Sequence, residues 1–334
     1  MNVSMWAKAV NVIPRVTKEE WDGLDVISRW LIATRSAVLV MTFISAAIAG
    51  LLAARDGHFN LLLWLLVTVG LLFAHATNNL VNDFTDHLKG VDKDNYFRAQ
   101  YGPQPLEHGL MTRNQVLLYI VATGLIALAA GLVLVAVRGQ ATLALLGAGA
   151  FFVLFYTWPL KYIGMGEVAV IIVWGPLMVG GGYYAITGQI SAPVVFASLP
   201  VALAATTVLF GKHIDKLAAD ESKGIRTMPV LLGERRARYA TIGMLTLQYL
   251  LVAGLVLSGY VSWLLLAVVF ALPWYVRALR VYRQPRPAGP PPDYPKHIWP
   301  LWYAALAFQH TRRFGSLFLL GLAADVVARK LGIL

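Results

Sequence analysis

The stretch of sequence that decides the fold runs from residue 59 to residue 86 and reads FNLLLWLLVTVGLLFAHATNNLVNDFTD. Its first part, residues 59–80, is long enough and apolar enough to cross a bilayer as a helix, which takes about 17 to 25 residues. Its last part, Asn78–Asp86, changes abruptly to amides and carboxylates. The stretch therefore predicts a membrane-spanning helix that ends in a dense polar cluster.

Similar apolar segments recur along the whole chain. Of its 334 residues, 58% are hydrophobic and 13% are charged, and this charged share is about half of that in soluble domains. The predicted spans are residues 33–54, 59–80, 116–137, 141–158, 166–187, 193–210, 240–259, 261–279 and 314–328. The sequence thus predicts an all-α, polytopic membrane protein with nine transmembrane helices. Because the chain has no cysteine, disulfides and thiolate chemistry are excluded.

The positive charges are distributed asymmetrically between the connections. The net charge of +11 could indicate a nucleic-acid-binding protein, but in so apolar a chain the preference of Lys and Arg for cytoplasmic connections explains it more simply. With a cytoplasmic N-terminus, all but four of the 28 lysines and arginines face the cytoplasm. The exceptions are Arg55, Arg138, Arg329 and Lys330. We therefore expect no nucleic-acid partner, and a cytoplasmic location for the long connections 81–115, 211–239 and 280–313.

Two segments outside the spans have a distinctive composition. Residues 1–30 are polar and contain Trp6, Trp21 and Trp30, which favours a segment lying on the membrane surface over a disordered one. Residues 283–296 are rich in proline and predict a semi-rigid linker. We expect residues 31–334 to form a single transmembrane domain.

The polar cluster after the second span has the spacing of one helical face. At about 100° per residue, Asn79, Asn82, Asp83 and Asp86 fall within an arc of roughly 100°. Amide and carboxylate oxygens are the ligands that magnesium takes, together with waters and substrate phosphates. We expect Asn79 and Lys89 to bind substrate, and Asn82, Asp83, Asp86 and Asp92 to be the metal ligands. The alternative is an ordinary polar loop, although carboxylates at the bilayer boundary are costly without a partner.

A second polar cluster, residues 212–227, follows the sixth span. On the same helical wheel His213, Lys216 and Asp220 share a face, whereas Asp215 points away. Their spacing copies that of Asn79, Asn82 and Asp86, which suggests a weak internal repeat. Lys212, Lys216 and Arg226 are candidate substrate ligands. For Arg226 and its neighbours Lys223 and Gly224, the alternative is the ordinary chemistry of a helix C-terminus.

A third feature lies in the short connection that follows residue 158. Lys161 is its only basic residue and is either a topological anchor or a ligand for an anion. A diphosphate substrate would unite the three features, because magnesium would bind the carboxylates while lysine and arginine bind the remaining oxygens. The apolar spans would then accommodate an oily tail. Tyr156 could stabilise a carbocation with its ring face, or it could simply pack.

Three separated motifs resemble the UbiA superfamily of intramembrane prenyltransferases. The run Asn82–Asp92 resembles the family's first aspartate-rich motif, and its Lys-Gly-x-Asp ending is most similar to the menaquinone branch, the 1,4-dihydroxy-2-naphthoate prenyltransferases. Residues 160–167 and 174–177 are similar to the central segment of that branch. Residues 220–233 resemble the end of its second motif. The resemblance covers residues 30–280.

This resemblance implies a nine-helix bundle with a central cavity, a magnesium-bound polyprenyl diphosphate and an aromatic acceptor. It also implies that Asn82, Asp83 and Asp86 ligate Mg²⁺, that Lys161 holds the diphosphate and that Asp220 is a ligand from the second motif. The resemblance thus implies that the two acidic clusters, at the inner membrane surface, bind the diphosphate of one lipid through divalent metal ions.

The second motif departs from the family pattern. Where the family has Asn, then Arg-Asp, then Asp four residues after that first Asp, this chain has His213, then Asp215-Lys216, then Asp220. A regular helix would direct Asp215 away and place Lys216 in the ligand position, so that a fixed cation replaces part of the metal charge. A locally unwound helix would still allow Asp215 to ligate.

We therefore predict a Mg²⁺-dependent transfer of a polyprenyl group from its diphosphate to an aromatic acceptor. The resemblance to the menaquinone branch favours 1,4-dihydroxy-2-naphthoate as this acceptor. Alternative acceptors are homogentisate, 4-hydroxybenzoate, a chlorophyllide or a lipid glycerol phosphate. Alternatives from other classes are a membrane transporter, because internal repeats and intramembrane polar residues also occur there, and an inactive lipid-binding relative. Chain length of the donor and oligomeric state are not encoded in the motifs.

Overall fold

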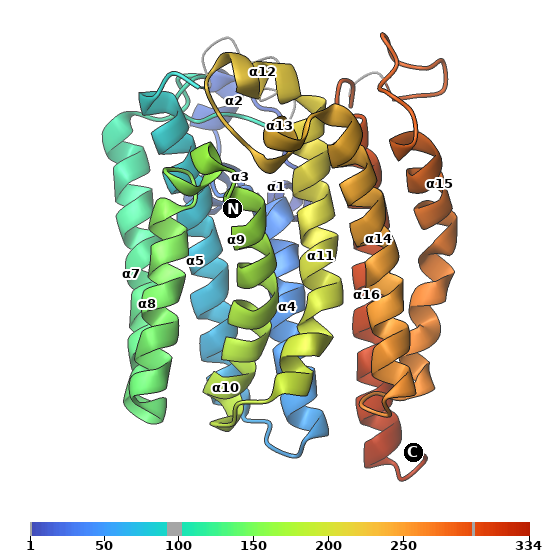
Figure 1. Cartoon of the computed structure of the whole chain (residues 1–334). Helices are drawn as coiled ribbons and strands as arrows, with labels where there is room; N and C mark the ends of the chain where they lie inside the picture. Colours follow the sequence, from blue (N-terminus) through green and yellow to red (C-terminus); the bar gives the residue numbers. More distant parts are fainter. Residues whose placement is uncertain (1, 92–101, 296–297) are drawn as a thin grey trace. The chain divides into compact units, whose positions relative to one another are not determined.

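The computed structural model describes residues 2–91, 102–295 and 298–334. These residues form helices joined by turns and contain no strand (Figure 1). The chain divides into two compact units, one made of residues 1–43 and 68–160 and the other of residues 44–67 and 161–334. The all-α class predicted from the sequence is confirmed.

The first unit contains the N-terminal helices and the helices around the first polar cluster. Its helices are α1 (Val3–Asn11), α2 (Lys18–Asp22), α3 (Val26–Ala33), the beginning of α4 (Ser36–Arg55), most of α5 (Leu61–Leu88), α7 (Arg113–Arg138) and α8 (Gln140–Phe155). Helices α7 and α8 lie side by side as a hairpin (Figure 1). Gly139 joins them with a φ of +79°, a conformation that glycine adopts without strain.

The N-terminal segment is folded into short helices, and hydrogen bonds to Asp25 connect α1 to α3. This residue caps α3 by accepting a hydrogen bond from the Ser28 N–H (2.9 Å). It also accepts hydrogen bonds from the Asn2 N–H (2.7 Å) and from Trp6 Nε1 (3.0 Å). The Ser28 hydrogen bond, with those from Trp6 and Asn2, holds the pKa of the Asp25 carboxyl well below its usual range. Charged Asp25 therefore fastens α1 to α3.

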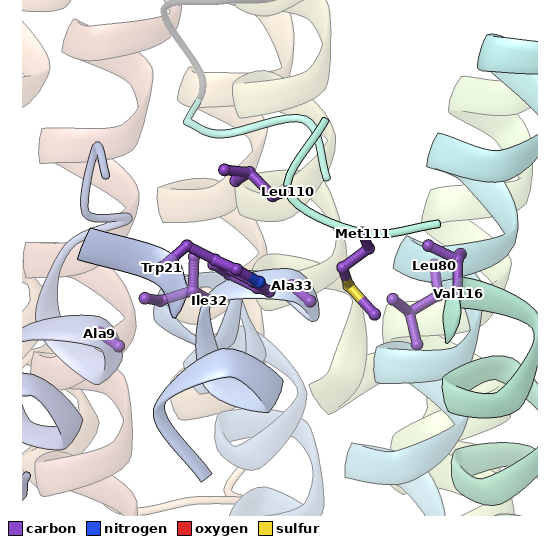
Figure 2. Packing of buried hydrophobic residues seen from close by; sticks show 8 residues of the cluster. All are labelled: Ala9, Trp21, Ile32, Ala33, Leu80, Leu110, Met111 and Val116. Atoms are coloured by element: carbon purple, nitrogen blue, oxygen red, sulfur yellow. The ribbon is translucent and has the colours of Figure 1, made fainter. Parts of the chain in front are cut away.

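An apolar cluster connects these short helices to the polar end of α5. Figure 2 shows Trp21 beside Ile32 and Ala33, and Met111 beside Leu80 and Val116. Burying a large apolar side chain contributes about 1.5 to 3 kcal/mol. The cluster therefore fixes α3 and the start of α7 against the helix that carries the first polar cluster. The predicted location of residues 1–30 on the membrane surface stays a prediction.

The second unit contains the remaining helices. They are α9 (Gly166–Ile172), η2 (Val173–Gly180), α10 (Gly181–Thr187), α11 (Ala192–Asp215), α12 (Leu217–Ser222), α13 (Met228–Leu232), α14 (Glu234–Leu257), η3 (Trp263–Ala271), α15 (Leu272–Tyr282) and α16 (Tyr303–Lys330), after the short 3₁₀ turn η1 (Leu160–Ile163). Helix α11 is at the centre of this unit, because it packs against α9, η2, α14 and α16. Its buried side chains include His213 and Asp215 of the second polar cluster.

The observed helices agree closely with the predicted spans. Seven helical segments are long and apolar enough to cross a membrane, and α8 is a shorter apolar helix, among the residues that the structure describes. The chain is thus an integral, multi-pass membrane protein. The segment Gly166–Thr187 is one such span although its middle, Val173–Gly180, is wound as a π-helix around Pro176, because proline cannot donate the usual helical hydrogen bond.

The last predicted span lies inside a longer helix. The predicted span was 314–328, but α16 extends over Tyr303–Lys330. Arg312 and Arg313 lowered the hydropathy of its first turns. In the structure the Arg313 guanidinium lies 5.0 Å from the centre of the Trp274 ring, so that a cation–π contact accommodates it. The proline-rich stretch, where described, has no regular helix.

Candidate active site

Helix α5 carries the first polar cluster on its last turns. It has 28 residues and is therefore about 42 Å long at 1.5 Å per residue, whereas the hydrocarbon core is about 30 Å thick. The helix closes through hydrogen bonds from the Gly90 N–H to the His87 oxygen (3.0 Å) and from the Val91 N–H to the Asp86 oxygen (2.9 Å). Gly90 has a φ of +66°, as is usual for a glycine that ends a helix.

The two asparagines of this cluster are oriented by neighbours in the same unit. Asn79 donates a hydrogen bond from Nδ2 to the backbone oxygen of Thr34 (2.9 Å). Asn82 donates from Nδ2 to Oγ1 of Thr157 (3.0 Å). An amide has a donor nitrogen and an acceptor oxygen, and Thr157 binds the nitrogen. The Asn82 carbonyl oxygen is therefore the atom that this side chain offers to a cation.

Asp83 is paired with Arg35, which lies between α3 and α4. The guanidinium Nη2 donates to Asp83 Oδ1, and both side chains are largely buried. Arg35 has a φ of 55°, an unfavourable conformation for a residue with a side chain, of the kind that occurs at functional sites. Arg35 contacts Asp83, and Thr157 contacts Asn82. On the helical wheel Asp86 lies between Asn82 and Asp83, and it is 4% exposed.

The other candidates of the first unit lie near the cytoplasmic connection expected from the sequence. Lys89 is exposed, and its Nζ is 4.9 Å from the centre of the Trp158 ring. Tyr156 is half-buried at the C-cap of α8, one residue before Thr157. Asp92, a predicted metal ligand, lies outside the described residues.

Lys161 belongs to the second unit and lies in the 3₁₀ turn η1. It is 5% exposed. A buried ammonium is costly unless negative charge or hydrogen-bond acceptors compensate it. Burial thus fits a ligand for an anion better than an anchor that only sets topology, for which an exposed side chain would suffice.

The end of α11 is held by a buried hydrogen bond between His213 and Glu167. His213 Nδ1 lies 2.5 Å from Glu167 Oε1, and each side chain is 2% exposed. The other Glu167 oxygen accepts a hydrogen bond from the Met228 N–H (3.2 Å). One carboxylate therefore joins α9, the end of α11 and the start of α13.

Lys216 and Asp220 form a buried ion pair. Helix α11 ends at Asp215, and Lys216 has φ −113° and ψ 20°, which is not helical. Its Nζ donates to Asp220 Oδ1 at 2.7 Å, and the two side chains are 7% and 2% exposed. The second oxygen of Asp220, Oδ2, has no hydrogen-bond partner in the described part of the protein. It is the one carboxylate oxygen of this ion pair with capacity for a ligand.

Asp215, a predicted metal ligand, accepts hydrogen bonds at the start of another helix, α16. Its Oδ1 accepts a hydrogen bond from the Tyr303 N–H and its Oδ2 one from the Ala304 N–H, both at 3.0 Å. These are the first free amides of α16, which a carboxylate stabilises at a helix N-terminus. The sequence left open whether Asp215 points away from Lys216 and Asp220 or turns toward them where the helix unwinds. In the structure Asp215 points toward α16, even though the helix breaks at Lys216.

The two remaining basic candidates differ in exposure. Lys212 is half-buried on the last turns of α11, whereas Arg226 is exposed in the segment that follows Gly224. Gly224 has a φ of +69°, and its N–H bonds to the Glu221 oxygen at 3.0 Å. This is the helix-ending chemistry considered for the sequence, and it leaves the Arg226 side chain at the surface.

The donor sets of the two clusters suit magnesium unequally. Over the described ranges, no three His, Asp or Glu side chains gather closely enough to hold a metal ion by themselves. A magnesium ion that keeps waters and shares substrate phosphates needs only one or two protein carboxylates. Asp86 with the Asn82 carbonyl oxygen fits that requirement. In the second cluster, Asp215 and Glu167 are committed elsewhere and Asp220 is paired with a cation.

Three residues of these clusters were not predicted as functional from the sequence. Arg35 was counted only among the cytoplasmic charges, and Thr157 and Glu167 were given no role. Glu167 did carry a detectable signal, because an acidic residue inside a predicted span usually has a specific partner. Arg35 and Thr157 are recognisable only from contacts between residues distant in the sequence.

Comparison with known proteins identifies the family. Residues 43–294 match the model of the UbiA prenyltransferase family. The chain belongs to this family. It is therefore a prenyltransferase, and the transporter alternative is withdrawn. The family assignment confirms the resemblance found in the three motifs.

Individual relatives support the same assignment. The chain is 30% identical over 221 residues to 1,4-dihydroxy-2-naphthoate octaprenyltransferase of Escherichia coli (strain K12), covering 63% of this chain and 70% of the relative. A solved UbiA homologue from Aeropyrum pernix K1, in its apo form, has 16% identity and a TM-score of 0.63 over 87% of this chain and 98% of that chain. One from Archaeoglobus fulgidus, bound to DMAPP and Mg²⁺, has 17% identity and a TM-score of 0.52 over 86% and 98%. These structures support the UbiA fold.

Proposed function

We propose that this UbiA prenyltransferase transfers a polyprenyl group from its diphosphate to 1,4-dihydroxy-2-naphthoate, with Mg²⁺ as cofactor. The observation that carries the proposal is the orientation of Asn82 by Thr157 beside the buried Asp86. It offers an amide oxygen and a carboxylate, as a magnesium diphosphate requires. The E. coli relative named for this acceptor and the DMAPP- and Mg²⁺-bound archaeal homologue support it.

We assign the metal ligands to the first cluster. Asn82 and Asp86 would ligate Mg²⁺, and Asp83 would join them, since a carboxylate has a second oxygen beyond the one that Arg35 binds. When bound, the metal would supply positive charge that stabilises the leaving diphosphate. Asn79 and Arg35 hold the shape of this cluster through Thr34 and Asp83.

The basic residues would hold the diphosphate as negative charge develops on it. In the reaction, the allylic carbon–oxygen bond breaks and its electron pair goes to the diphosphate. Lys161 is buried, so that its ammonium interacts with the anion in a poorly screened environment. We propose that Lys161 and Lys216 bind diphosphate oxygens, with Lys89, Lys212 and Arg226 nearer to solvent. Fixed charges of this kind stabilise a transition state without reorganisation.

The acceptor completes the reaction. A ring carbon of dihydroxynaphthoate would form the new bond to the allylic carbon, and the carboxylate would leave as carbon dioxide, returning its electron pair to the ring. The ring face of Tyr156 would attract the transient carbocation, by about 0.5 to 2 kcal/mol. We also propose that the N-terminus and both clusters face the cytoplasm, as the lysine and arginine distribution indicates.

An acceptor assay tests the proposal. Purified full-length protein in lipid nanodiscs is given Mg²⁺, radiolabelled geranylgeranyl diphosphate and one acceptor at a time. We expect a prenylated naphthoquinol and one carbon dioxide per diphosphate released with dihydroxynaphthoate, and no product when EDTA removes the metal. Product with homogentisate or 4-hydroxybenzoate alone would overturn the acceptor. Product in EDTA would overturn the role of Mg²⁺.

A further inference from the structure

The second cluster has few oxygen atoms that could bind a metal ion. Asp215 uses both carboxylate oxygens to accept amide hydrogens of α16. Glu167 uses one oxygen for His213 and the other for the Met228 N–H. Only Oδ2 of Asp220 is not hydrogen-bonded among the carboxylate oxygens of these three residues.

The charge around Asp220 also opposes a metal ion. Lys216 Nζ lies 2.7 Å from Asp220 Oδ1, and both side chains are buried. A divalent cation on the remaining oxygen of the same carboxylate would be repelled by this ammonium, at short distance and with little water to screen it. His213 does not compensate, because its Nδ1 faces Glu167 and magnesium prefers oxygen ligands. The second cluster therefore does not fit a magnesium ion.

We infer that this enzyme holds its donor diphosphate with one divalent ion, supplied by the first cluster, and that the Lys216 ammonium, held by Asp220, keeps a second ion out of the second cluster. The inference rests on the proposed function, because it concerns the same donor. It makes Asp220 a positioning residue that holds Lys216, in place of the predicted role as a metal ligand.

The inference predicts the number of bound metal ions. Purified full-length protein is saturated with geranylgeranyl thiolodiphosphate, in which sulfur replaces the bridging oxygen and prevents turnover, and is titrated with Mn²⁺. Electron paramagnetic resonance of free Mn²⁺ counts the ions bound per chain, after subtraction of the same analogue in protein-free nanodiscs. We expect one ion per chain in the wild-type complex. Two ions per chain would overturn the inference and leave the proposed function standing.

Variants separate a fixed cation from a metal ligand. Lys216→Asp should raise the count to two, because it adds oxygen ligands and removes the positive charge. Lys216→Gln, a milder change, should keep one ion while the analogue binds about 10- to 100-fold more weakly, the range for a lost hydrogen bond to a charged group. Asp220→Asn should also keep one ion. A count that falls on Asp220→Asn would overturn the inference, because Asp220 would then be a metal ligand.

Two controls complete the design. Glu221→Ala removes an exposed carboxylate next to Asp220 and should change neither the ion count nor the affinity for the analogue. If the wild-type protein does not bind the analogue at any Mn²⁺ concentration, the proposed function itself fails, and the inference fails with it. A failure of the proposed function is thereby distinguished from a second metal ion, which would contradict the inference alone.

Discussion

The end of α5 and the end of α11 have similar residues but use their carboxylates differently. On α5 the helix continues through Asn82 and Asp86, and neighbouring groups hold the edges of the arc. At the end of α11 the helix breaks at Lys216, and Asp215 caps a helix more than eighty positions later in the chain. The carboxylates at the two helix ends thus have different partners, because one helix continues and the other breaks. This difference can be tested, beginning with the largest expected effect.

Asp86→Ala should reduce the rate of prenyl transfer more than about 100-fold, because it removes a carboxylate that we assign to the metal of the leaving diphosphate. The rate is measured with saturating donor and acceptor. Asp293→Ala removes an exposed carboxylate from the proline-rich stretch and should keep the wild-type rate. Full activity of Asp86→Ala would refute the metal assignment of the α5 cluster.

Thr157→Val should raise the Mg²⁺ concentration for half-maximal rate by about 10- to 100-fold, as expected when a group that orients a metal ligand is lost. Valine has nearly the shape of threonine but cannot accept the hydrogen bond from Asn82 Nδ2. Thr157→Ser keeps the hydroxyl and should restore the wild-type requirement. An unchanged Mg²⁺ requirement in Thr157→Val would mean that Asn82 is not a ligand.

Asp215→Ala should destabilise the protein by about 1 to 3 kcal/mol, the cost of leaving buried amides without their acceptor. Thermal unfolding in detergent measures this loss. Asp215→Asn keeps one acceptor oxygen and should lose less stability. The affinity of the folded variants for Mn²⁺ with the thiolodiphosphate should remain that of the wild type, and a large loss would return Asp215 to the metal ligands.

Asp25 caps α3 as Asp215 caps α16, and it should have the smallest effect. Because hydrogen bonds from Ser28, Trp6 and Asn2 lower the pKa of Asp25, its contribution to docking of α1 is present above the ordinary carboxylate pKa of about 3.9. It is lost as the pH falls through the lower, folded-state pKa. Trp6 fluorescence should therefore stay constant as the pH falls from 7 to about 4 and change only in stronger acid.

Asp25→Ala should shift the Trp6 fluorescence at every pH, including neutral pH, and should abolish the acid transition. Arg29 contacts the same segment through the backbone oxygens of Trp21 and Asp22, so the segment as a whole should remain folded. If the wild-type transition is centred near the ordinary carboxylate pKa, Asp25 is not held in its charged form by these hydrogen bonds.

The sequence predicted the features that depend on short-range periodicity. Hydropathy located the spans, and a regular helical wheel placed Asn79, Asn82 and Asp86 on one face of a helix that the structure confirms. The start of α16 was not predicted, because residues 283–296 are rich in proline and because Arg312 and Arg313 lower the hydropathy of the first turns of the helix. At the second cluster the wheel predicted that Asp215 points away, as the structure shows, but no proline or glycine signalled the break of the helix at Lys216.

The partners of the charged residues could not be predicted for a different reason. Arg35 and Asp83 are separated by 48 positions, and Asp215 and Tyr303 by 88. No local pattern records such a pairing, since it depends on how helices pack. The motifs thus identified which residue types belong to the candidate site, whereas their division between metal ligands and structural caps required the contacts.

The length of α5 has a consequence for how the enzyme would meet its donor. Asn79 lies about 27 Å from the first residue of the helix at 1.5 Å per residue, close to the thickness of the hydrocarbon layer. A polyprenyl diphosphate bound there would keep its chain among the acyl tails while its head group is held at the water boundary. Encounter would then occur by lateral diffusion. Turnover should accordingly follow the mole fraction of donor within the membrane, and diluting the proteoliposomes with buffer should leave it unchanged.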